Sequence, residues 1–361
     1  MPIIVTNDFP PGHGGIQRYM ARLAEQLSAR DLGVTVITRK APGSRQYDRG
    51  AAYRTLRYGG TGKLNDLLRM TAGLYRSARA ASGFVIASLW FPAGLAALLL
   101  PRPFRGRLVV LVHGAELRPS RKGLRRALMR YVLHSADVVV ANSSYTRELI
   151  RQCGILRDVA VVHCGVDASP IEPQPATAPT ILAVGRLVAR KGFDRLLQAL
   201  PAILEKVPSA RCEIVGGGPQ RDELGALVRQ LGLLENVTFL GELSDEELRA
   251  AYSRAWCFAL PVRNVDDNVE GFGIVYLEAA MASLPAIGGR HSGADDAIAD
   301  GETGILVDGE KPPEIAAAIV SLLEDPARAR EMGRRGRDRA LKSFSWSAAT
   351  TALLETIAAP R

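Results

Sequence analysis

The chain has 361 residues, of which 47% are hydrophobic and 23% charged, and its formal charge is +9. This length suits two domains that each bury a core, and the composition excludes a disordered or collagen-like protein. The four cysteines lie far apart and form no CxxC pair. Neither a disulfide framework nor a zinc site is therefore predicted, and a reducing compartment is the simplest interpretation.

In chain order, the first half alternates short apolar runs with amphipathic stretches. These runs are continuous in Val, Ile and Leu rather than alternating with polar residues, which favours a parallel sheet covered on both faces. We therefore expect a doubly wound α/β domain over residues 1–170. The strands are predicted at 3–6, 34–38, 84–87, 108–113, 138–142 and 160–163, and helices at 15–29, 65–81 and 93–100.

A proline-rich segment at 168–179 then reads as a linker between domains. The α/β pattern restarts after it, so a second domain of the same class is expected over 171–343, followed by a C-terminal helix within 344–361 that packs on the first domain. A cleft between two such halves is the expected site. Strands are predicted at 180–184, 212–215, 237–240, 257–260, 285–287 and 304–307, and helices at 193–205, 220–231, 245–253, 273–282, 313–323 and 326–341.

Residues 83–100 carry no charge, and a run of eighteen such residues is near the lower limit for a membrane-spanning helix. Pro92 and Gly94 divide this run, so a buried strand and a short helix are expected there instead. The N-terminus has no basic region before Asp8, and a signal peptide is not expected either. These features indicate a cytoplasmic protein, either soluble or peripheral on the inner face of the plasma membrane.

Positive charge is concentrated in the first half of the chain. Residues 1–170 hold 25 Lys and Arg against 10 Asp and Glu, whereas residues 171–361 hold 21 against 27. Aromatic residues are not interleaved with the basic ones as they are in proteins that stack on nucleic acid, so a nucleic-acid partner is not expected.

The densest basic cluster is predicted to lie on one half of a helix, opposite an apolar half. Two interpretations stay open: a solvated surface face, and a helix lying against anionic lipid, where each basic residue contributes about 1 kcal/mol. The basic character of the whole first half favours the membrane surface. The basic half consists of Arg118, Arg121, Lys122, Arg125, Arg126 and Arg130, and the apolar half of Leu124, Ala127, Leu128 and Tyr131.

A glycine-rich turn, Pro-Pro-Gly-His-Gly-Gly at 10–15, lies between the first strand and the first helix. Gly14 and Gly15 let the backbone approach a ligand closely, and the helix N-terminus offers N–H groups to an anion. Gln17 stands where the GxGxxG fingerprint has its third glycine. Taken alone, the turn is equally consistent with a structural role.

Two cations follow the first strand of the second domain, in Gly-Arg-Leu-Val-Ala-Arg-Lys-Gly at 185–192. Arg186 and Lys191 on a strand-to-helix loop are suited to clamp phosphate oxygens. A pair of solvated surface cations is the alternative.

Glu270 and Glu278 are eight residues apart around a predicted helix start near Gly273. The first amides of that helix are suited to hold a phosphate, and the Glu278 side chain leans back toward them, within reach of a ribose hydroxyl. Glu270 in the preceding loop is placed for a sugar hydroxyl. Alternatively, Glu278 is a helix residue favoured by the dipole.

His113 ends a buried strand at the edge where open α/β sheets bind their ligands. A structural histidine and a functional one are equally consistent with this position.

The E-x7-E pattern from Glu270 to Glu278, with the 185–192 motif upstream, resembles the GT-B fold retaining glycosyltransferases of family GT4. The resemblance covers nearly the whole chain, including Gly-Gly-Gly-Pro at 216–219 and Asn-Val-Thr-Phe-Leu-Gly at 236–241. The stretches at 6–17 and 269–278 look like the branch of GDP-mannose-dependent phosphatidylinositol mannosyltransferases. Related enzymes of polysaccharide and lipopolysaccharide assembly share such stretches.

This resemblance implies two Rossmann-like domains facing across a cleft, an acceptor-side N-terminal domain and a nucleotide-sugar-binding C-terminal domain. Arg186 and Lys191 would neutralise the diphosphate, and His113 would line the sugar site. Glu270 would hold the donor sugar and Glu278 the ribose. The residues that the resemblance places around the donor are Gly14, Gly15, Val237, Leu240, Gly273, Ile274, Val275 and Glu278, with His113, Glu270, Arg186 and Lys191 in catalysis.

The implied reaction moves a hexose, mannose from GDP-mannose, to a hydroxyl of a lipid-linked or polysaccharide acceptor and keeps the α configuration. No metal or other cofactor is expected, and Asp266-Asp267, the nearest approach to a DxD loop, reads as loop acids. Three alternatives remain: a UDP-sugar-dependent transferase of cell-surface polysaccharide assembly, a nucleotide-sugar 2-epimerase, and a non-catalytic nucleotide-sugar-binding scaffold. Asp295 and Asp296 depart from the Gly-Gly-x-Pro-Glu of the family, so no role is carried over to them.

Overall fold

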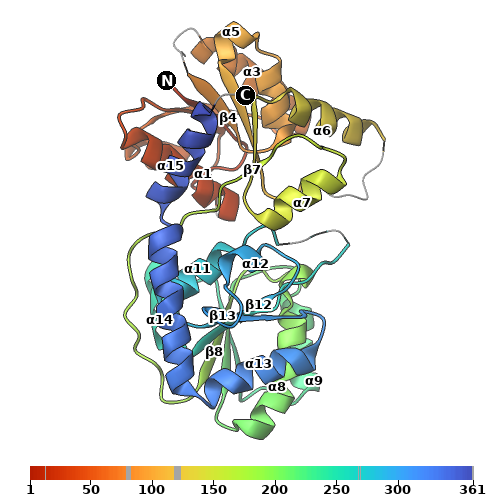
Figure 1. Cartoon of the computed structure of the whole chain (residues 1–361), viewed down its shortest axis with the longest axis vertical. Coiled ribbons are helices and arrows are strands. Elements are labelled where there is room, and N and C mark those ends of the chain that lie inside the picture. Colours follow the sequence, from red (N-terminus) through yellow and green to blue (C-terminus); the bar gives the residue numbers. More distant parts are fainter. Residues whose placement is uncertain (13, 79–82, 118–122, 267, 269, 360–361) are drawn as a thin grey trace. The chain divides into compact units, whose positions relative to one another are not determined.

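The protein is described by a computed structural model that covers residues 1–12, 14–78, 83–117, 123–266, 268 and 270–359 (Figure 1). The chain divides into two compact units. Unit 1 comprises Met1–Gly165 together with Trp346–Arg361, and unit 2 comprises Val166–Ser345. The C-terminal segment thus returns to the unit that holds the N-terminus.

Unit 1 contains a seven-stranded parallel sheet in the order β3-β2-β1-β4-β5-β6-β7. Its central strands consist mostly of buried apolar residues, as expected for a sheet covered on both faces. The edge strand β3 was not predicted, because charged Arg54 and Arg57 interrupt its apolar residues. The strands are β1 (Ile3–Val5), β2 (Thr35–Arg39), β3 (Arg54–Tyr58), β4 (Phe84–Ala87), β5 (Arg107–Val112), β6 (Val138–Ala141) and β7 (Ala160–Val161).

The helices of unit 1 include a pair formed by the first and the last helix of the chain, which pack on each other (Figure 1). The Arg30 guanidinium holds the start of the last helix by donating to the carbonyl and hydroxyl of Ser347. The helices are α1 (Gly15–Ser28), α2 (Ser44–Arg49), α3 (Lys63–Ala78), η1 (Trp90–Gly94), α4 (Leu95–Leu98), α5 (Arg102–Arg105), α6 (Leu124–Ser135), α7 (Ser144–Gln152) and α15 (Trp346–Ala358).

The uncharged run at 83–100 forms β4, the π-helical turn η1 and α4. Within the described residues, no helix is both long and apolar enough to cross a membrane.

Helix α6 corrects the predicted orientation of the basic helix. Leu124 is 86% and Tyr131 61% exposed, while Met129, Val132 and Leu133 are buried. Leu124 and Tyr131 of the expected apolar half therefore face outward, while α6 packs on η1 and α4. Of the six basic residues of the cluster, Arg125, Arg126 and Arg130 lie on α6, and Arg118, Arg121 and Lys122 lie outside the described residues.

Unit 2 contains a six-stranded parallel sheet in the order β10-β9-β8-β11-β12-β13. Together, the two sheets confirm the expected doubly wound α/β architecture. The strands are β8 (Thr180–Val184), β9 (Arg211–Val215), β10 (Val237–Gly241), β11 (Cys257–Leu260), β12 (Ala286–Gly289) and β13 (Gly304–Val307). The helices are η2 (Ala189–Lys191), α8 (Phe193–Lys206), α9 (Arg221–Gln230), α10 (Asp245–Arg254), α11 (Ile274–Met281), α12 (Ala294–Ala297), α13 (Pro312–Leu323) and α14 (Pro326–Ser343).

Candidate functional site

The loop after β8 places Lys191 in a buried position at the carboxyl edge of the unit 2 sheet. Gly192 follows with φ +74°, and a Cβ atom there would lie 2.0 Å from the carbonyl oxygen of Pro261. Glycine is therefore required at this turn, where α8 begins. Lys191 is only 7% exposed, and its side chain passes over Gly185.

Lys191 and Glu270 form an ion pair, with Nζ 2.7 Å from Oε2. Arg190 adds a second positive charge at 3.9 Å from the same carboxylate oxygen. Burial by itself raises the pKa of Glu270, but the charges of Lys191 and Arg190 outweigh it, so the net pKa is lowered. The Glu270 carboxylate is thereby kept ionised beside the two cations Lys191 and Arg190.

Glycine backbone joins three loops at this edge of the sheet. A Cβ on Gly216 would lie 2.2 Å from the carbonyl oxygen of Gly185, and one on Gly218 would lie 2.5 Å from that of Leu187. The amide of Leu187 donates to Gly217 at 2.9 Å, and that of Gly216 to Gly241 at 2.7 Å. Backbone hydrogen bonds thus join the loops after β8 and β9 to each other and to the end of β10.

The E-x7-E segment begins in a loop and continues into α11. Gly273 precedes the helix with φ +82°, and a Cβ there would lie 2.6 Å from the ring of Tyr276. The carbonyl of Glu270 accepts a hydrogen bond from the amide of Gly293 at 2.9 Å. The helix N-terminus at Ile274 and Val275 presents amides without intrahelical acceptors, which is the arrangement that binds anions.

Glu278 lies on α11 and accepts a hydrogen bond from the hydroxyl of Tyr252 at 3.1 Å. Tyr252 is buried on α10, so its ring is fixed by packing. Sequence reasoning missed this partner, because no local pattern links residues 26 positions apart on two different helices.

Arg186 is exposed, and within the described part of the chain it makes no ion pair. Arg186, Lys191, Glu270 and Glu278 nevertheless lie on segments that follow the carboxyl ends of β8 and β11. These two strands are neighbours in the sheet, so their loops emerge side by side. Of these four residues, Lys191 and Glu270 are in direct contact.

The expected nucleobase segment, Val237 to Leu240, is the edge strand β10. Its register to β9 shifts between Phe239 and Gly241, and the Arg221 guanidinium lies 3.9 Å from the Phe239 ring centroid. An edge strand leaves backbone N–H and C=O groups without a ladder partner. The segment therefore has main-chain groups to offer to a ligand.

In unit 1, His113 directly follows β5, and its ring is held in an uncharged state. Burial lowers its pKa to about 4, and the Ser88 carbonyl, which accepts a hydrogen bond from the ring, opposes that shift in part. Nε2 is buried and has no hydrogen-bond partner. A buried ring nitrogen without a protein partner is rare in a folded protein, and a water molecule or a ligand group would satisfy it.

Glu116 was not singled out in the sequence, although it stands only three residues after His113. One of its carboxylate oxygens accepts the His113 amide at 2.7 Å. Burial raises the pKa of Glu116 to about 7, because the backbone amides of His113, Glu116 and Gly114 offset the burial only in part. The carboxylate thus fixes the loop that carries the histidine.

Gly14 and Gly15 form the start of α1, as predicted. Gly14 has φ +152°, and a Cβ there would lie 2.4 Å from the Gln17 side-chain oxygen. Gln17 in turn donates to Asp8 at 3.4 Å, and burial raises the pKa of Asp8. The turn therefore depends on glycine for its shape. His13 lies outside the described residues.

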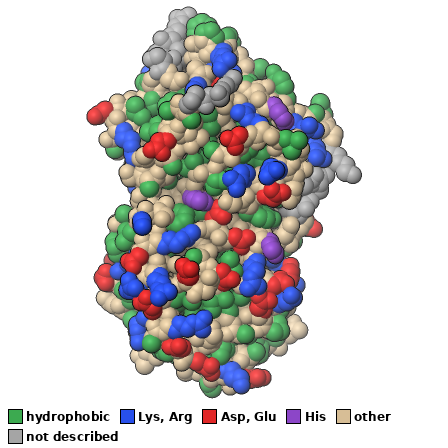
Figure 2. Space-filling model, viewed as in Figure 1, with side chains coloured by type: hydrophobic (Ala, Val, Ile, Leu, Met, Phe, Trp, Pro, Cys, Tyr) green, Lys and Arg blue, Asp and Glu red, His purple; other side chains and the backbone are tan. Residues whose placement is uncertain are grey.

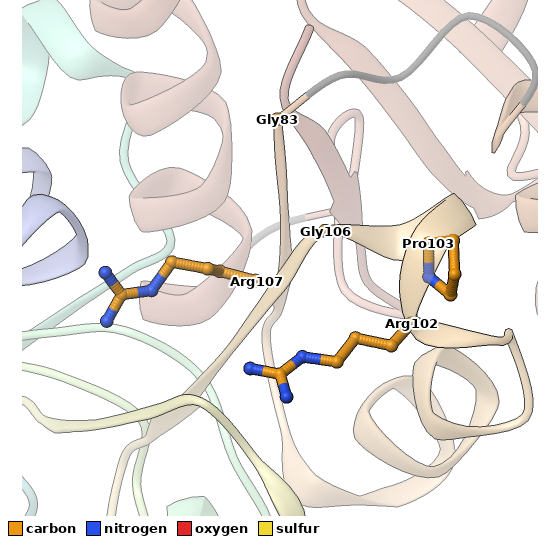
Figure 3. A pocket seen from close by; sticks show the side chains of 5 residues that line it. All are labelled: Gly83, Arg102, Pro103, Gly106 and Arg107. Atoms are coloured by element: carbon orange, nitrogen blue, oxygen red, sulfur yellow. The ribbon is translucent and has the colours of Figure 1, made fainter. Parts of the chain in front are cut away.

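The other surface features are weaker candidates for a binding site than these loops. A cavity of about 450 Å³ at the amino ends of β4 and β5 is lined by Arg102 and Arg107, which are already hydrogen-bonded to Asp137 and Ala359 (Figure 3). Basic and acidic side chains are closely mixed over unit 2 (Figure 2). Among the described residues, no three His, Cys, Asp or Glu side chains are grouped as metal ligands.

Two family models cover most of the chain. Residues 13–170 match the model described as Glycosyltransferase Family 4, and residues 167–339 match Glycosyl transferases group 1. A GDP-mannose-dependent alpha-(1-6)-phosphatidylinositol monomannoside mannosyltransferase of Mycolicibacterium smegmatis is 35% identical, over 99% of this chain and 98% of that protein. The chain belongs to glycosyltransferase family 4.

Further relatives and solved structures also resemble this glycosyltransferase. The glycogen synthase of Mycobacterium tuberculosis is 32% identical over 64% of the chain and 56% of that enzyme. Among solved structures, the HepE protein of Anabaena in complex with UDP matches with a TM-score of 0.83 at 19% identity, over 99% of both chains. Sucrose-phosphate synthase of Thermosynechococcus elongatus matches with a TM-score of 0.81 at 24% identity, over 99% of this chain and 98% of that one. These structures confirm the GT-B fold.

Proposed function

We propose that this glycosyltransferase moves mannose from GDP-mannose to a hydroxyl of a lipid-linked acceptor of the phosphatidylinositol mannoside type, with retention of the α configuration. Full-length relatives at 35% identity bear names that specify this donor and acceptor class. The structural observation that carries the proposal is the buried Lys191–Glu270 pair beside the N-terminus of α11. It offers positive charge to a diphosphate and a carboxylate to sugar hydroxyls in one place.

The chemistry requires stabilisation of a charged leaving group. As the bond from the anomeric carbon to the phosphate oxygen breaks, negative charge grows on the diphosphate and positive charge on the sugar. Lys191, Arg186 and the first amides of α11 stabilise the diphosphate, and electrostatic stabilisation of this kind usually contributes most to the rate enhancement of an enzyme. With these groups in place, the proposed reaction needs no metal or other cofactor.

The remaining predicted residues orient the donor and complete the transfer. Glu270 accepts hydrogen bonds from the sugar, Glu278 from the ribose, and the backbone between Val237 and Leu240 contacts the base. His113 offers its Nε2 to a sugar hydroxyl. The acceptor oxygen forms a bond to the anomeric carbon on the face that the phosphate leaves, and its proton passes to the departing phosphate oxygen.

A donor screen followed by a transfer assay tests this function. Thermal shifts with GDP-mannose, UDP-glucose and ADP-glucose should show the largest stabilisation with GDP-mannose, because a ligand that binds only the folded state raises its stability. Radiolabelled mannose should then appear in a phosphatidylinositol mannoside fraction. Preference for a UDP-sugar would instead support the polysaccharide alternative. A 2-epimerised donor would identify an epimerase, and binding without any turnover would identify a scaffold.

We also propose that unit 1 binds the inner, anionic face of the plasma membrane. Exposed apolar side chains follow one face of α3 at Leu64, Leu68 and Tyr75, and Leu124 and Tyr131 project from α6. Large exposed apolar side chains that gather on one part of a protein mark interaction surfaces.

The charges around these side chains favour anionic lipid as the partner. Lys63, Arg69 and Arg76 are exposed on α3, and Arg130 is exposed on α6. Between residues 59 and 136 the acidic residues are Asp66 and Glu116. The Asp66 side chain is 1% exposed in its pair with Arg39, and the carboxylate of Glu116 binds the His113 amide. Basic and apolar groups thus combine without exposed acids, as on amphipathic membrane-surface helices.

Sedimentation with lipid vesicles tests this surface. The protein should bind vesicles that contain phosphatidylglycerol and not vesicles of phosphatidylcholine alone. Leu64→Ser/Leu68→Ser and Arg69→Gln/Arg130→Gln should each weaken binding, whereas Leu234→Ser should not, although Leu234 is equally exposed at 65% in unit 2. Equal binding by all variants would contradict the proposal.

A further inference from the structure

The imidazole of His113 has an aromatic neighbour on α1. The rings of His113 and Tyr19 meet edge to face, with centroids 5.7 Å apart and an interplanar angle of 77°. The Ser88 carbonyl binds one ring nitrogen, and Nε2 has no partner. The contact with Tyr19 therefore acts together with that hydrogen bond to orient the imidazole ring.

Tyr19 is itself held by the C-terminal helix. Its ring meets that of Trp346, the first residue of α15, with centroids 5.5 Å apart and an angle of 66°. Tyr19 is 4% and Trp346 6% exposed, so both rings are packed on all sides. A chain of three rings therefore runs from α15 through α1 to the residue that follows β5.

The backbone around Trp346 is built to accept its indole. A Cβ on Gly165 would lie 2.5 Å from the Trp346 ring, so a side chain at 165 would displace it. The Arg30 guanidinium binds the next residue, Ser347, at its carbonyl and its hydroxyl. The start of α15 is thus held at two points, by Arg30 in the segment after α1 and by the close approach of Gly165.

Trp346 also occupies a particular place in the connectivity of the chain. The chain passes from unit 1 to unit 2 after Gly165 and returns to unit 1 at Trp346. The last residue before the first passage and the first residue after the second are therefore in contact.

We propose that Tyr19 and Trp346 are positioning residues for His113. Through these two rings, α15 orients the imidazole of His113 and excludes water from it. The inference rests on the proposed function only in that His113 contacts the donor sugar. Edge-to-face aromatic contacts have a defined geometry that an aliphatic side chain of similar size does not reproduce. Replacing either ring by leucine should therefore let the imidazole rotate and let water reach it.

The ionisation of His113 reports on this packing. Among the described residues, the titratable groups near it include Tyr19 on α1, whose ring meets the imidazole, Cys164 beside Tyr19, and Glu116, which binds the backbone amide of His113. Burial is the main cause of the low pKa of His113, about 4. Water at the ring would relieve that burial and move the pKa upward, toward its ordinary value.

Nuclear magnetic resonance of the full-length protein labelled with ¹⁵N-histidine tests the proposal without any substrate. The His113 signal, assigned with His113→Gln, should remain that of a neutral ring between pH 5 and 8 in the wild type. Tyr19→Leu and Trp346→Leu should raise its pKa by about one unit or more. Tyr19→Phe and Trp346→Phe keep the rings and should behave as the wild type.

Leu353→Ala serves as the matched control, because Leu353 is buried on the same helix but is no part of the three-ring chain. It should destabilise α15 without moving the His113 pKa. An unchanged pKa in both leucine variants, or an equal change in Leu353→Ala, would overturn the proposal. If a leucine variant does not fold, Trp346→Phe and the smaller Trp346→His still compare an aromatic pair with a weakened one.

A kinetic measurement separates this inference from the proposed function. With the ring loosened, Tyr19→Leu should lower kcat about tenfold while Tyr19→Phe stays within about twofold. A raised His113 pKa without any loss of turnover would support positioning by Tyr19 but would show that His113 does not act in the sugar site. Normal pKa values with a loss of turnover would contradict positioning itself.

Discussion

Glu116 in unit 1 and Glu270 in unit 2 are both carboxyl groups largely shielded from solvent, yet their pKa values move in opposite directions. Burial raises the pKa of Glu116 to about 7, where only backbone amides oppose it. The same burial raises the pKa of Glu270, but Lys191 and Arg190 outweigh it and the net pKa is lowered. The charge of a buried carboxyl group is therefore decided by its partners rather than by burial.

This difference extends to the groups around each carboxylate. His113 beside Glu116 is neutral, with a pKa of about 4, and its neighbours are aromatic rings. Lys191 beside Glu270 is a buried cation in contact with a buried anion. This difference fits the roles proposed above, in which unit 2 receives the charged diphosphate and the His113 region of unit 1 contacts uncharged hydroxyl groups.

The largest effect on turnover is expected for Lys191→Ala, which removes the cation paired with Glu270 in unit 2. Turnover should fall roughly 10²–10³-fold, the order found when one donor to a developing oxyanion is lost. The measurement is initial-rate transfer at saturating donor. Because Lys191 lowers the pKa of Glu270, the variant should also lose its residual activity at a higher pH than the wild type on the acid side.

Lys206→Ala is the matched control for that variant. Lys206 is exposed at the end of α8, the helix that begins just after Lys191. Its removal should leave turnover unchanged. Near wild-type turnover in Lys191→Ala would exclude this lysine from the site.

A smaller effect is expected for Tyr252→Phe, which removes one hydrogen bond from Glu278 without removing the ring. A hydrogen bond to a charged group contributes about 1.5–3 kcal/mol, so donor affinity should fall by about one to two orders of magnitude. Calorimetry with GDP measures it. Tyr75→Phe, which removes the exposed hydroxyl that donates to Leu99, should leave the affinity unchanged. Equal affinities in both variants would show that Tyr252 does not position Glu278.

The smallest effect is expected for Glu116→Gln, on the pH dependence of stability. Between about pH 4.5 and 7 the folded protein binds the Glu116 proton and the unfolded chain does not, so this group's contribution to stability falls as pH rises. His113 acts in the opposite sense between about pH 4 and 6.5, because there the unfolded chain binds the proton. Glu116→Gln removes the contribution of Glu116 and keeps that of His113.

The Tm of Glu116→Gln relative to the wild type should therefore increase from pH 5 to pH 7.5, by roughly 3 °C. Differential scanning calorimetry measures the difference. Glu148→Gln, which alters an exposed carboxyl group on α7, should run parallel to the wild type at all pH values. A constant difference for Glu116→Gln would mean that Glu116 is already ionised in the folded protein.

The central strands and the glycine-rich loops were predictable, because their signals are local. Continuous Val, Ile and Leu runs mark buried parallel strands, and the strands at 84–87, 180–184, 257–260 and 304–307 were predicted with their observed ends. The edge strand β3 and the helix α7 were not predicted. Their residues are more polar, since one side of each remains near solvent.

The sequence by itself determined the fold class and the kinds of group at the loops proposed to bind the diphosphate, because strand ends, glycines and helix starts are properties of short segments. It determined neither the Tyr252 hydroxyl on Glu278 nor the rings of Tyr19 and Trp346 behind His113. Those contacts join residues far apart in the chain, and only the packing of one element on another brings them together. The pKa of each carboxyl group was likewise decided by tertiary structure, since burial and neighbouring charge exist only in the folded protein.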